Sequence, residues 1–338
     1  MRGPALYTGG SAKAAYQWSE AMALRRVTVF GGSGFLGRYV VERLADRDLT
    51  VQVAVRDPEA AKHLRTLGQV SQVTPFACDV TDAAAVARAV EGTDGVINLV
   101  GILAERGRQT FKSVHVDAPA AVAIAAASAG VESLVHVSAI GAADNALSEY
   151  SRSKAAGEAA VRGAFPDAVI MRPSVIFGPE DGFFNLFAGL ARMSPLLPLF
   201  GGGHTRFQPV YVADVADAVV AGLTDPAARG KTYELGGPRV ASFAELMALM
   251  LAEIRRKRLL VPVPFFVGDI QATLAGILPK PPVTRDQMKS LRADNVVSAD
   301  AATLDDLGIF ATAMESILPT YLHRYRRGGR LGRTPIAD

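Results

Sequence analysis

The 338-residue sequence is poor in the residues that form disulfides and metal sites. It has one cysteine, Cys78, which excludes an internal disulfide and favours a reducing compartment. Its five histidines, at positions 63, 115, 136, 204 and 323, show no metal-ligand spacing, so we predict no metal site. The net charge of +3, with no long basic stripe or aromatic ladder, argues against a nucleic-acid partner.

Long hydrophobic runs are also missing. The one candidate for a membrane span, residues 259–278, is interrupted by Pro262, Pro264 and Asp269. Residues 1–24 lack the continuous apolar core of a secretory signal and have few of the arginines of a mitochondrial presequence. We expect them to be an N-terminal extension, either disordered or translated from a start codon upstream of Met22.

Glycine is concentrated where an apolar run meets a helical pattern. Residues 27–38 read VTVFGGSGFLGR, in which Val27 and Val29 precede Gly31, Gly34 and Gly37. A strand, a glycine turn and a helix in this order place the positive end of the helix under a diphosphate. The context makes a dinucleotide site the favoured interpretation over a tight turn without a ligand.

The chain then alternates between strands and helices. We predict strands near residues 51–55, 73–77, 95–100, 133–137 and 168–172, with helices over 36–45, 58–67, 82–92, 118–129 and 150–162. This alternation predicts an α/β fold, a Rossmann-type doubly wound parallel sheet.

After residue 172 the pattern becomes less regular. We predict a short strand at 210–212, a helix at 215–223 capped by Asp214, and a return to the sheet at 233–235. From Ser242 onward the pattern is helix, proline-rich turn, helix. The predicted nucleotide-binding domain therefore comprises 25–180 and 205–238, a small helical C-terminal domain comprises 181–204 and 239–325, and residues 326–338 form a basic tail.

The end of the second strand predicts the type of dinucleotide. An acidic residue there suits a ribose 2′-hydroxyl, whereas an arginine suits a 2′-phosphate. This chain has Arg56, and the following Asp57-Pro58 assigns Asp57 to capping. Arg38, just after Gly37, adds a second positive charge. We predict NADPH over NADH, and a solvated strand-end role for Arg56 is the alternative.

Further contacts to the dinucleotide are expected along the carboxyl edge of the sheet. Asp79, next to Val80, is placed to accept from adenine, or equally to cap the next helix. Gly101 permits close approach of the backbone to a ligand. The complete predicted set is Gly31, Ser33, Gly34, Phe35, Leu36, Arg38, Arg56, Asp79, Val80, Leu99, Gly101, Tyr150, Lys154 and Pro173.

A second group of residues carries acid–base chemistry. Tyr150 and Lys154 lie four apart on one predicted helix, so they share a face. An ammonium beside a tyrosine lowers the pKa of the phenol, which can then exchange a proton with an alcohol or carbonyl. Ser138 follows the fifth strand and is expected to hydrogen-bond the same oxygen. We predict Ser138, Tyr150 and Lys154 as the catalytic set of an active enzyme.

These motifs resemble the short-chain dehydrogenase/reductase superfamily, in its extended or atypical branch. The resemblance rests on GGSGFLG, Asp79-Val80, Ser138, YSRSK and RPSVIFGPED. Longer stretches are similar to the accessory-subunit family of respiratory complex I (NADH:ubiquinone oxidoreductase) that is built on this fold. These stretches are VTVFGGSGFLGRYVV, AGVESLVHVSAIGA, AFPDAVIMRPSVIFGPEDGFFN, QPVYVADVADAV, VTRDQMKSLRADNVVS and LDDLGI.

The resemblance implies a tightly held NADPH, docking on the peripheral arm of complex I near the quinone site, and no settled substrate. Two features separate the chain from sugar-nucleotide epimerases. Tyr150 follows Ser138 by twelve positions, closer than in most of them, and residues 181–198 are mostly apolar. Such a segment suits a lipid-like ligand or a protein partner, although packing of the small domain explains most of these residues.

The C-terminal half also predicts a surface for a membrane or an acidic partner. Four consecutive basic residues, 255–258, precede a stripe formed by Phe266, Ile270, Leu274 and Ile277. The tail adds Arg324, Arg326, Arg327, Arg330 and Arg333. A solvated helix over a small core is the alternative. We expect a peripheral protein on the cytoplasmic face of a bacterial inner membrane, or on the matrix side if the source is eukaryotic.

Three functions therefore remain open from the sequence. The leading hypothesis is an accessory subunit of complex I whose NADPH mainly stabilises the fold. An active NADP-dependent reductase or epimerase, acting on an apolar carbonyl or a nucleotide-sugar, is the alternative. A redox sensor, whose docking depends on NADPH occupancy, is the third.

Overall fold

The computed structural model describes residues 24–275 and 284–329. The predictions for residues 1–23, for Ile277 and for the tail residues Arg330 and Arg333 lie outside this range, as does the side chain of Leu274. No helix in the described ranges is long and apolar enough to cross a membrane.

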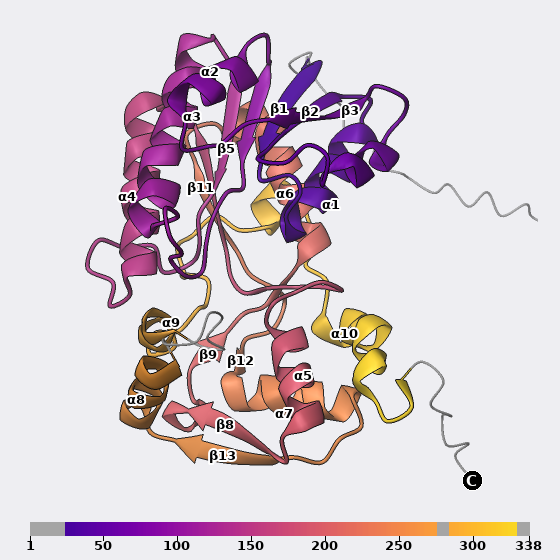
Figure 1. Ribbon diagram of the computed structural model, residues 1–338, viewed down its shortest axis with the longest axis vertical. Helices are drawn as coiled ribbons and strands as arrows, with labels where there is room; N and C mark the ends of the chain where they lie inside the picture. Colours follow the sequence, from indigo (N-terminus) through magenta and orange to yellow (C-terminus); the bar gives the residue numbers. More distant parts are fainter. Residues whose placement is uncertain (1–23, 276–283, 330–338) are drawn as a thin grey trace, which may run out of the picture.

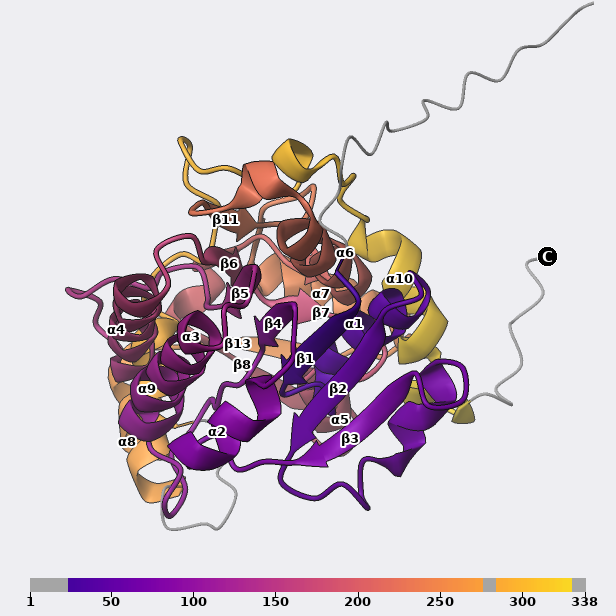
Figure 2. The same ribbon diagram turned by 90° about the horizontal axis from the view of Figure 1, so that it is seen from above.

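A seven-stranded parallel sheet forms the larger part of the molecule (Figures 1 and 2). The strand order is β11-β6-β5-β4-β1-β2-β3. Its strands are β1 (Arg26–Phe30), β2 (Thr50–Val55), β3 (Val73–Ala77), β4 (Gly95–Asn98), β5 (Ser133–Val137), β6 (Val169–Pro173) and β11 (Thr232–Leu235). The predicted doubly wound sheet is confirmed, including the return of residues 233–235, which pair with β6.

Helices cover both faces of this sheet, which explains why its central strands are almost entirely apolar. On one face, α1 (Phe35–Ala45) and α6 (Val212–Thr224) share a hydrophobic cluster with β1 and β2. On the other face, α2 (Ala83–Val90), α3 (Ala118–Ser128) and α4 (Glu149–Ala164) pack on a second cluster. Figure 2 shows the two layers on either side of the strands.

The predicted boundaries need two corrections in this domain. β4 ends at Asn98 rather than at residue 100, because the Asn98 side chain accepts the backbone N–H of Val100 and turns the chain. Asp214 is not the N-cap of α6, which begins at Val212. Its carboxylate instead accepts the backbone N–H of Thr312 at 2.7 Å and the Thr312 hydroxyl at 2.9 Å, and so fastens the C-terminal segment to α6.

A smaller unit lies below the carboxyl ends of the strands in Figure 1. Its helices are α5 (Phe184–Met193), α7 (Phe243–Glu253), α8 (Phe265–Ala275), α9 (Arg285–Ser290) and α10 (Met314–Leu322). Its core contains Phe184, Leu197 and Phe243, so most of the apolar segment 181–198 packs this unit. Short strands connect the helices: β7 (Ile176–Phe177) with β10 (Val210–Tyr211), β9 (Arg206–Phe207) with β12 (Ala241–Ser242), and β8 (Leu196–Phe200) with β13 (Leu259–Val263).

The β8–β13 pair is a feature that the sequence pattern did not predict. Residues 259–263 form a parallel strand where we expected only a proline-rich turn between helices. Pro262 pairs in register with Leu199 in a two-stranded ribbon. Both strands are edge strands, so a proline, which has no backbone N–H to donate, is tolerated there. The apolar residues of this segment therefore build a sheet edge at the end of the molecule farthest from β1–β3 (Figure 1).

Candidate functional site

The glycine turn has the geometry of a dinucleotide-binding loop. Gly31 has φ of +80°, a conformation that favours glycine, and a Cβ at Gly37 would lie 2.3 Å from the Gly31 carbonyl oxygen. These two glycines let α1 start directly beneath the turn. Gly34 caps α1 in an extended conformation and no acidic residue lies in its first turn, so the helix N-terminus is free to attract an anion.

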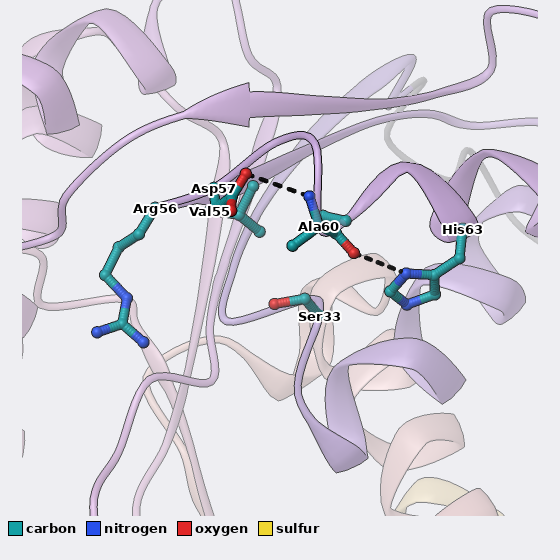
Figure 3. A pocket seen from close by; sticks show the side chains of 7 residues that line it. Ser33, Val55, Arg56, Asp57, Ala60 and His63 are labelled. Carbon is teal, nitrogen blue, oxygen red and sulfur yellow. Dashed lines mark hydrogen bonds between the residues drawn. The ribbon is translucent and has the colours of Figure 1, made fainter.

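A cavity of about 510 Å³ opens beside this turn (Figure 3). It is lined by Ser33, Val55, Arg56, Asp57, Ala60, Ala61 and His63. The structure thus brings the predicted Ser33 and Arg56 to one cavity. The cavity is also lined by His63, which the sequence analysis did not connect with the cofactor. His63 lies only seven residues after Arg56, in the segment between β2 and β3, and this proximity could have indicated it.

Asp57 caps a turn rather than the helix that the sequence predicted, since the N-cap of the following helix is Ala61. Asp57 Oδ1 accepts the backbone N–H groups of Glu59 at 3.0 Å and Ala60 at 3.2 Å. The chain that follows forms a turn and then a 3₁₀ helix at Lys62–Leu67, rather than a continuous helix from Pro58. No carboxylate in the described part of the chain forms an ion pair with Arg56, which leaves its guanidinium available to an anionic ligand.

The other predicted cofactor residues fall into two sets. Phe35, Leu36, Leu99 and Pro173 lie at the glycine turn or at strand ends, as predicted. Arg38 does not line the cavity, because it points toward Glu180, 3.9 Å away. Asp79 accepts the backbone N–H and the hydroxyl of Thr81, which lowers the pKa of its carboxyl group. The capping alternative for Asp79 is wrong, because the N-cap of α2 is Asp82, whose side chain accepts the backbone N–H groups of Ala84 and Ala85. Half-buried Val80 packs on the second cluster.

Ser138, Tyr150 and Lys154 come from β5 and α4 at the carboxyl edge of the sheet. Lys154 is buried, and its Nζ donates to the Val137 carbonyl oxygen at 3.0 Å. The Ser138 hydroxyl is also buried, and no group in the described chain forms a hydrogen bond with it. A Cβ at Gly101 would lie 3.4 Å from Lys154 Nζ, so the segment that follows β4 lies next to the Lys154 ammonium.

The expected effect of Lys154 on Tyr150 needs a correction. Burial raises the pKa of the Tyr150 phenol to about 12, and burial lowers the pKa of the Lys154 ammonium to about 8. Lys154 is committed to a main-chain carbonyl, and the cost of burying charge outweighs its attraction for a phenolate. In this state Tyr150 is a neutral phenol, a hydrogen-bond donor rather than a base.

His115 is a site residue that sequence reasoning missed. It lies in a π-helix, Lys112–Asp117, an irregularity that is frequent at functional sites. Its Nε2 accepts the backbone N–H of Ile102 at 3.0 Å, so Nδ1 carries the proton and donates to the Ser153 hydroxyl at 2.9 Å. The ring meets Tyr150 edge-on, with centroids 5.3 Å apart. His115 therefore links the β4 end to the helix that carries Tyr150.

Buried histidines make this region sensitive to protonation. Burial, with a further contribution from Lys154, lowers the pKa of His115 to about 3. His136 on β5 is fully buried, and burial lowers its pKa as well. Its Nδ1 accepts from the Asn98 amide at 3.2 Å, which leaves a protonated Nε2 that has no hydrogen-bond partner in the described chain.

The small unit also contributes to the position of Tyr150. Asp286, in α9, accepts the backbone N–H of Glu149 at 2.8 Å and of Tyr150 at 2.9 Å. A carboxylate at the start of a helix satisfies free N–H groups and interacts favourably with the helix dipole. The first turn of α4 is thus held from across the two parts of the molecule.

Comparison with known families identifies the chain. Residues 27–236 match the model of the NAD dependent epimerase/dehydratase family. The chain belongs to this family. The chain is 39% identical over 302 residues to mitochondrial NADH dehydrogenase [ubiquinone] 1 alpha subcomplex subunit 9 of Mus musculus, covering 88% of this chain and 80% of the mouse protein. This family member therefore also belongs with the subunit 9 proteins, as the sequence motifs indicated.

The chain is also similar to a reductase over part of its length and to a solved oxidoreductase in its fold. The ceramide reductase of Caulobacter vibrioides is 36% identical over 204 residues, which cover 59% of this chain and 61% of that protein. The structure of an NADPH-dependent quinone oxidoreductase of Escherichia coli superimposes with a TM-score of 0.69 at 19% identity, covering 88% of this chain and 98% of that one. At that identity the likeness establishes the Rossmann-type fold alone.

Proposed function

We propose that this family member is an accessory subunit of respiratory complex I, which holds NADPH mainly as a structural element. The observation that carries the proposal is the 39% identity to a complex I subunit over most of both chains. The Lys154 ammonium, which donates to the Val137 carbonyl oxygen, supports a nucleotide that is held rather than turned over. Docking is on the peripheral arm near the quinone site.

The choice of NADPH rests on the cavity beside the glycine turn. It is lined by the Arg56 guanidinium and by the polar side chains of His63 and Ser33, and its one carboxylate, Asp57, accepts two backbone N–H groups through Oδ1. A ribose 2′-phosphate in this cavity would receive charge-assisted hydrogen bonds from Arg56. A 2′-hydroxyl would leave the guanidinium without an anionic partner. When bound, NADPH would supply a hydride; the residues around it supply position and charge.

The test of this function is complementation of assembly. In cells that lack the chain, membranes resolved by native electrophoresis should lose assembled NADH:ubiquinone oxidoreductase, and the wild-type chain should restore it. Arg56→Ala should restore less, because a ligand that binds the folded state stabilises it by RT ln(1 + [L]/Kd). Full assembly with a variant that binds no nucleotide would contradict a structural role for the cofactor.

A second candidate is an NADP-dependent reductase for an apolar carbonyl. The buried Ser138 hydroxyl without a protein partner favours it, because such a group is satisfied by a substrate oxygen. The similarity to a ceramide reductase points in the same direction. NADPH oxidation with a long-chain ketone, lost on Tyr150→Phe while assembly persists, would establish this activity.

We also propose that the protein lies on the membrane surface through its C-terminal half, on the cytoplasmic face in a bacterium or the matrix face in a mitochondrion. The basic residues 255–258 and the exposed side chains of Phe266 and Ile270 on α8 support this position. Sedimentation with native membranes at low salt, and release at high salt, would test it.

A further inference from the structure

Arginine side chains from three separate segments meet at the end of the molecule opposite β1–β3. Arg258 Nε donates to the Ala191 carbonyl oxygen at 2.7 Å, near the end of α5. Arg256 Nε donates to the Tyr325 carbonyl oxygen at 2.8 Å, in the 3₁₀ turn His323–Tyr325 that follows α10. These bonds join the segment before β13 to the end of α5 and to the C-terminal turn.

The guanidinium groups gathered by these contacts repel one another. Burial and the nearby charges of Arg258, Arg327 and Arg192 lower the pKa of Arg256. Glu253, three residues before Arg256, is paired with Arg326 at 3.7 Å. We call Arg192, Arg256, Arg258 and Arg327 the arginine cluster; no ion pair in the described ranges neutralises any of its members. Its excess positive charge fits an anionic partner.

Apolar side chains are exposed beside the cluster. Met193 is 81% exposed and follows Arg192; Leu259 is 63% exposed and follows Arg258. Leu259 is paired with Leu196 in the β8–β13 ribbon, and Leu196 is exposed too. At the far end of the ribbon, α8 exposes Phe266 and Ile270. All these elements lie along the lower edge of Figure 1.

We propose that the arginine cluster, with Met193, Leu196 and Leu259, binds the headgroups of anionic phospholipids in a bilayer. Guanidinium groups bind lipid phosphates, and the adjacent apolar side chains enter the headgroup boundary. A folded acidic protein would satisfy the charge, but it fits less well a row of separated, highly exposed apolar side chains along one edge. This inference deepens the proposed membrane association and rests on it.

Vesicle sedimentation of the full chain tests the proposal. The chain should bind vesicles of phosphatidylcholine and phosphatidylglycerol at low salt and should not bind phosphatidylcholine alone. Arg192→Gln with Arg327→Gln removes two exposed charges that form no hydrogen bond with other residues of the described ranges, and should weaken partitioning by about 30-fold. The matched control, Arg65→Gln with Arg88→Gln, removes two exposed charges from the sheet domain and should bind like wild type.

Equal binding to neutral and anionic vesicles would overturn the proposal, and so would equal binding of anionic vesicles by the cluster variant and the wild type. A cluster variant that fails to join complex I although the wild type ignores vesicles would assign the cluster to an acidic protein. Assembly of the wild-type chain into complex I is measured separately, so a failure of the proposed complex I function can be distinguished from a failure of lipid binding.

Discussion

Lys154 Nζ donates to the carbonyl oxygen of Val137, the last residue of β5, at 3.0 Å. This contact turns the ammonium toward the sheet and keeps it buried. Burial lowers the pKa of the ammonium to about 8, so keeping this lysine charged at neutral pH reduces the stability of the folded chain. A bound dinucleotide, with its negative charge, would relieve that cost.

Lys154→Met should stabilise the nucleotide-free chain. A folded-state pKa of about 8 against an ordinary 10.5 corresponds to at most about 3 kcal/mol, because one pKa unit equals about 1.4 kcal/mol. The cost is fully present below pH 8 and disappears as pH rises toward 10.5, where the unfolded chain also loses the proton. Urea denaturation at pH 7 and pH 10 should show an advantage for the variant that shrinks with pH. An equal or smaller free energy of unfolding at pH 7 would be inconsistent with a costly buried charge.

Arg56→Ala should remove the preference for NADPH. Loss of a charge-assisted hydrogen bond costs about 1.5–3 kcal/mol, so the Kd for NADPH should rise about 10- to 100-fold while that for NADH changes little. Lys62→Gln is the matched control, because Lys62 is exposed, pairs with Glu59 and does not line the cavity. Fluorescence titration of the purified chain measures both constants. Equal affinity of the wild type for the two nucleotides would refute the assignment of NADPH.

Acid should destabilise the chain through its buried histidines. The pKa of His115 is lowered to about 3, so the folded chain stays neutral at this residue while the unfolded chain takes up a proton below about pH 6.5. Its share of stability is therefore present above pH 6.5 and lost as pH falls. Between pH 6.5 and 5 the loss is about 2 kcal/mol. His115→Asn should flatten this dependence by that amount, whereas His204→Asn, at an exposed position, should not. If the free energy of unfolding falls equally with pH in the wild type and both variants, His115 is not the source of the acid sensitivity.

Asp286→Asn should loosen the start of α4. An amide retains an oxygen for one N–H but loses the charge that interacts with the helix dipole, so we expect a loss of about 1 kcal/mol. Asp300→Asn is an exposed control for the removed charge. Thermal unfolding measures the loss, and hydrogen exchange at Glu149 and Tyr150 locates it. Unchanged protection of these two amides would show that Asp286 does not hold the helix.

The larger domain was largely predictable, since its signals are local. Val27 and Val29 before a glycine turn, and the regular spacing of strands and helices, specify a parallel sheet with few alternatives. The ends of elements were less predictable because they depend on single side chains. β4 ends early because the Asn98 side chain accepts the backbone N–H of Val100. Asp214 does not cap α6 because its carboxylate accepts the backbone N–H of Thr312, 98 residues away.

The candidate site was predictable in its residues but not in its charge state. Spacing placed Tyr150 and Lys154 on one face of α4, as the structure has them. Spacing carries no information on burial, which raises the pKa of Tyr150 and turns Lys154 to Val137. His115 and the β8–β13 ribbon depend on contacts between distant segments, and no local pattern marks them.

The central claim is that the chain holds NADPH within complex I. Affinity purification of the tagged full chain from native membranes at low salt, with analysis of co-purifying proteins and of the nucleotide released on denaturation, tests it most directly. We predict peripheral-arm subunits of complex I and NADPH at about one per chain. A chain that elutes without these subunits, or with no bound dinucleotide, would contradict the account.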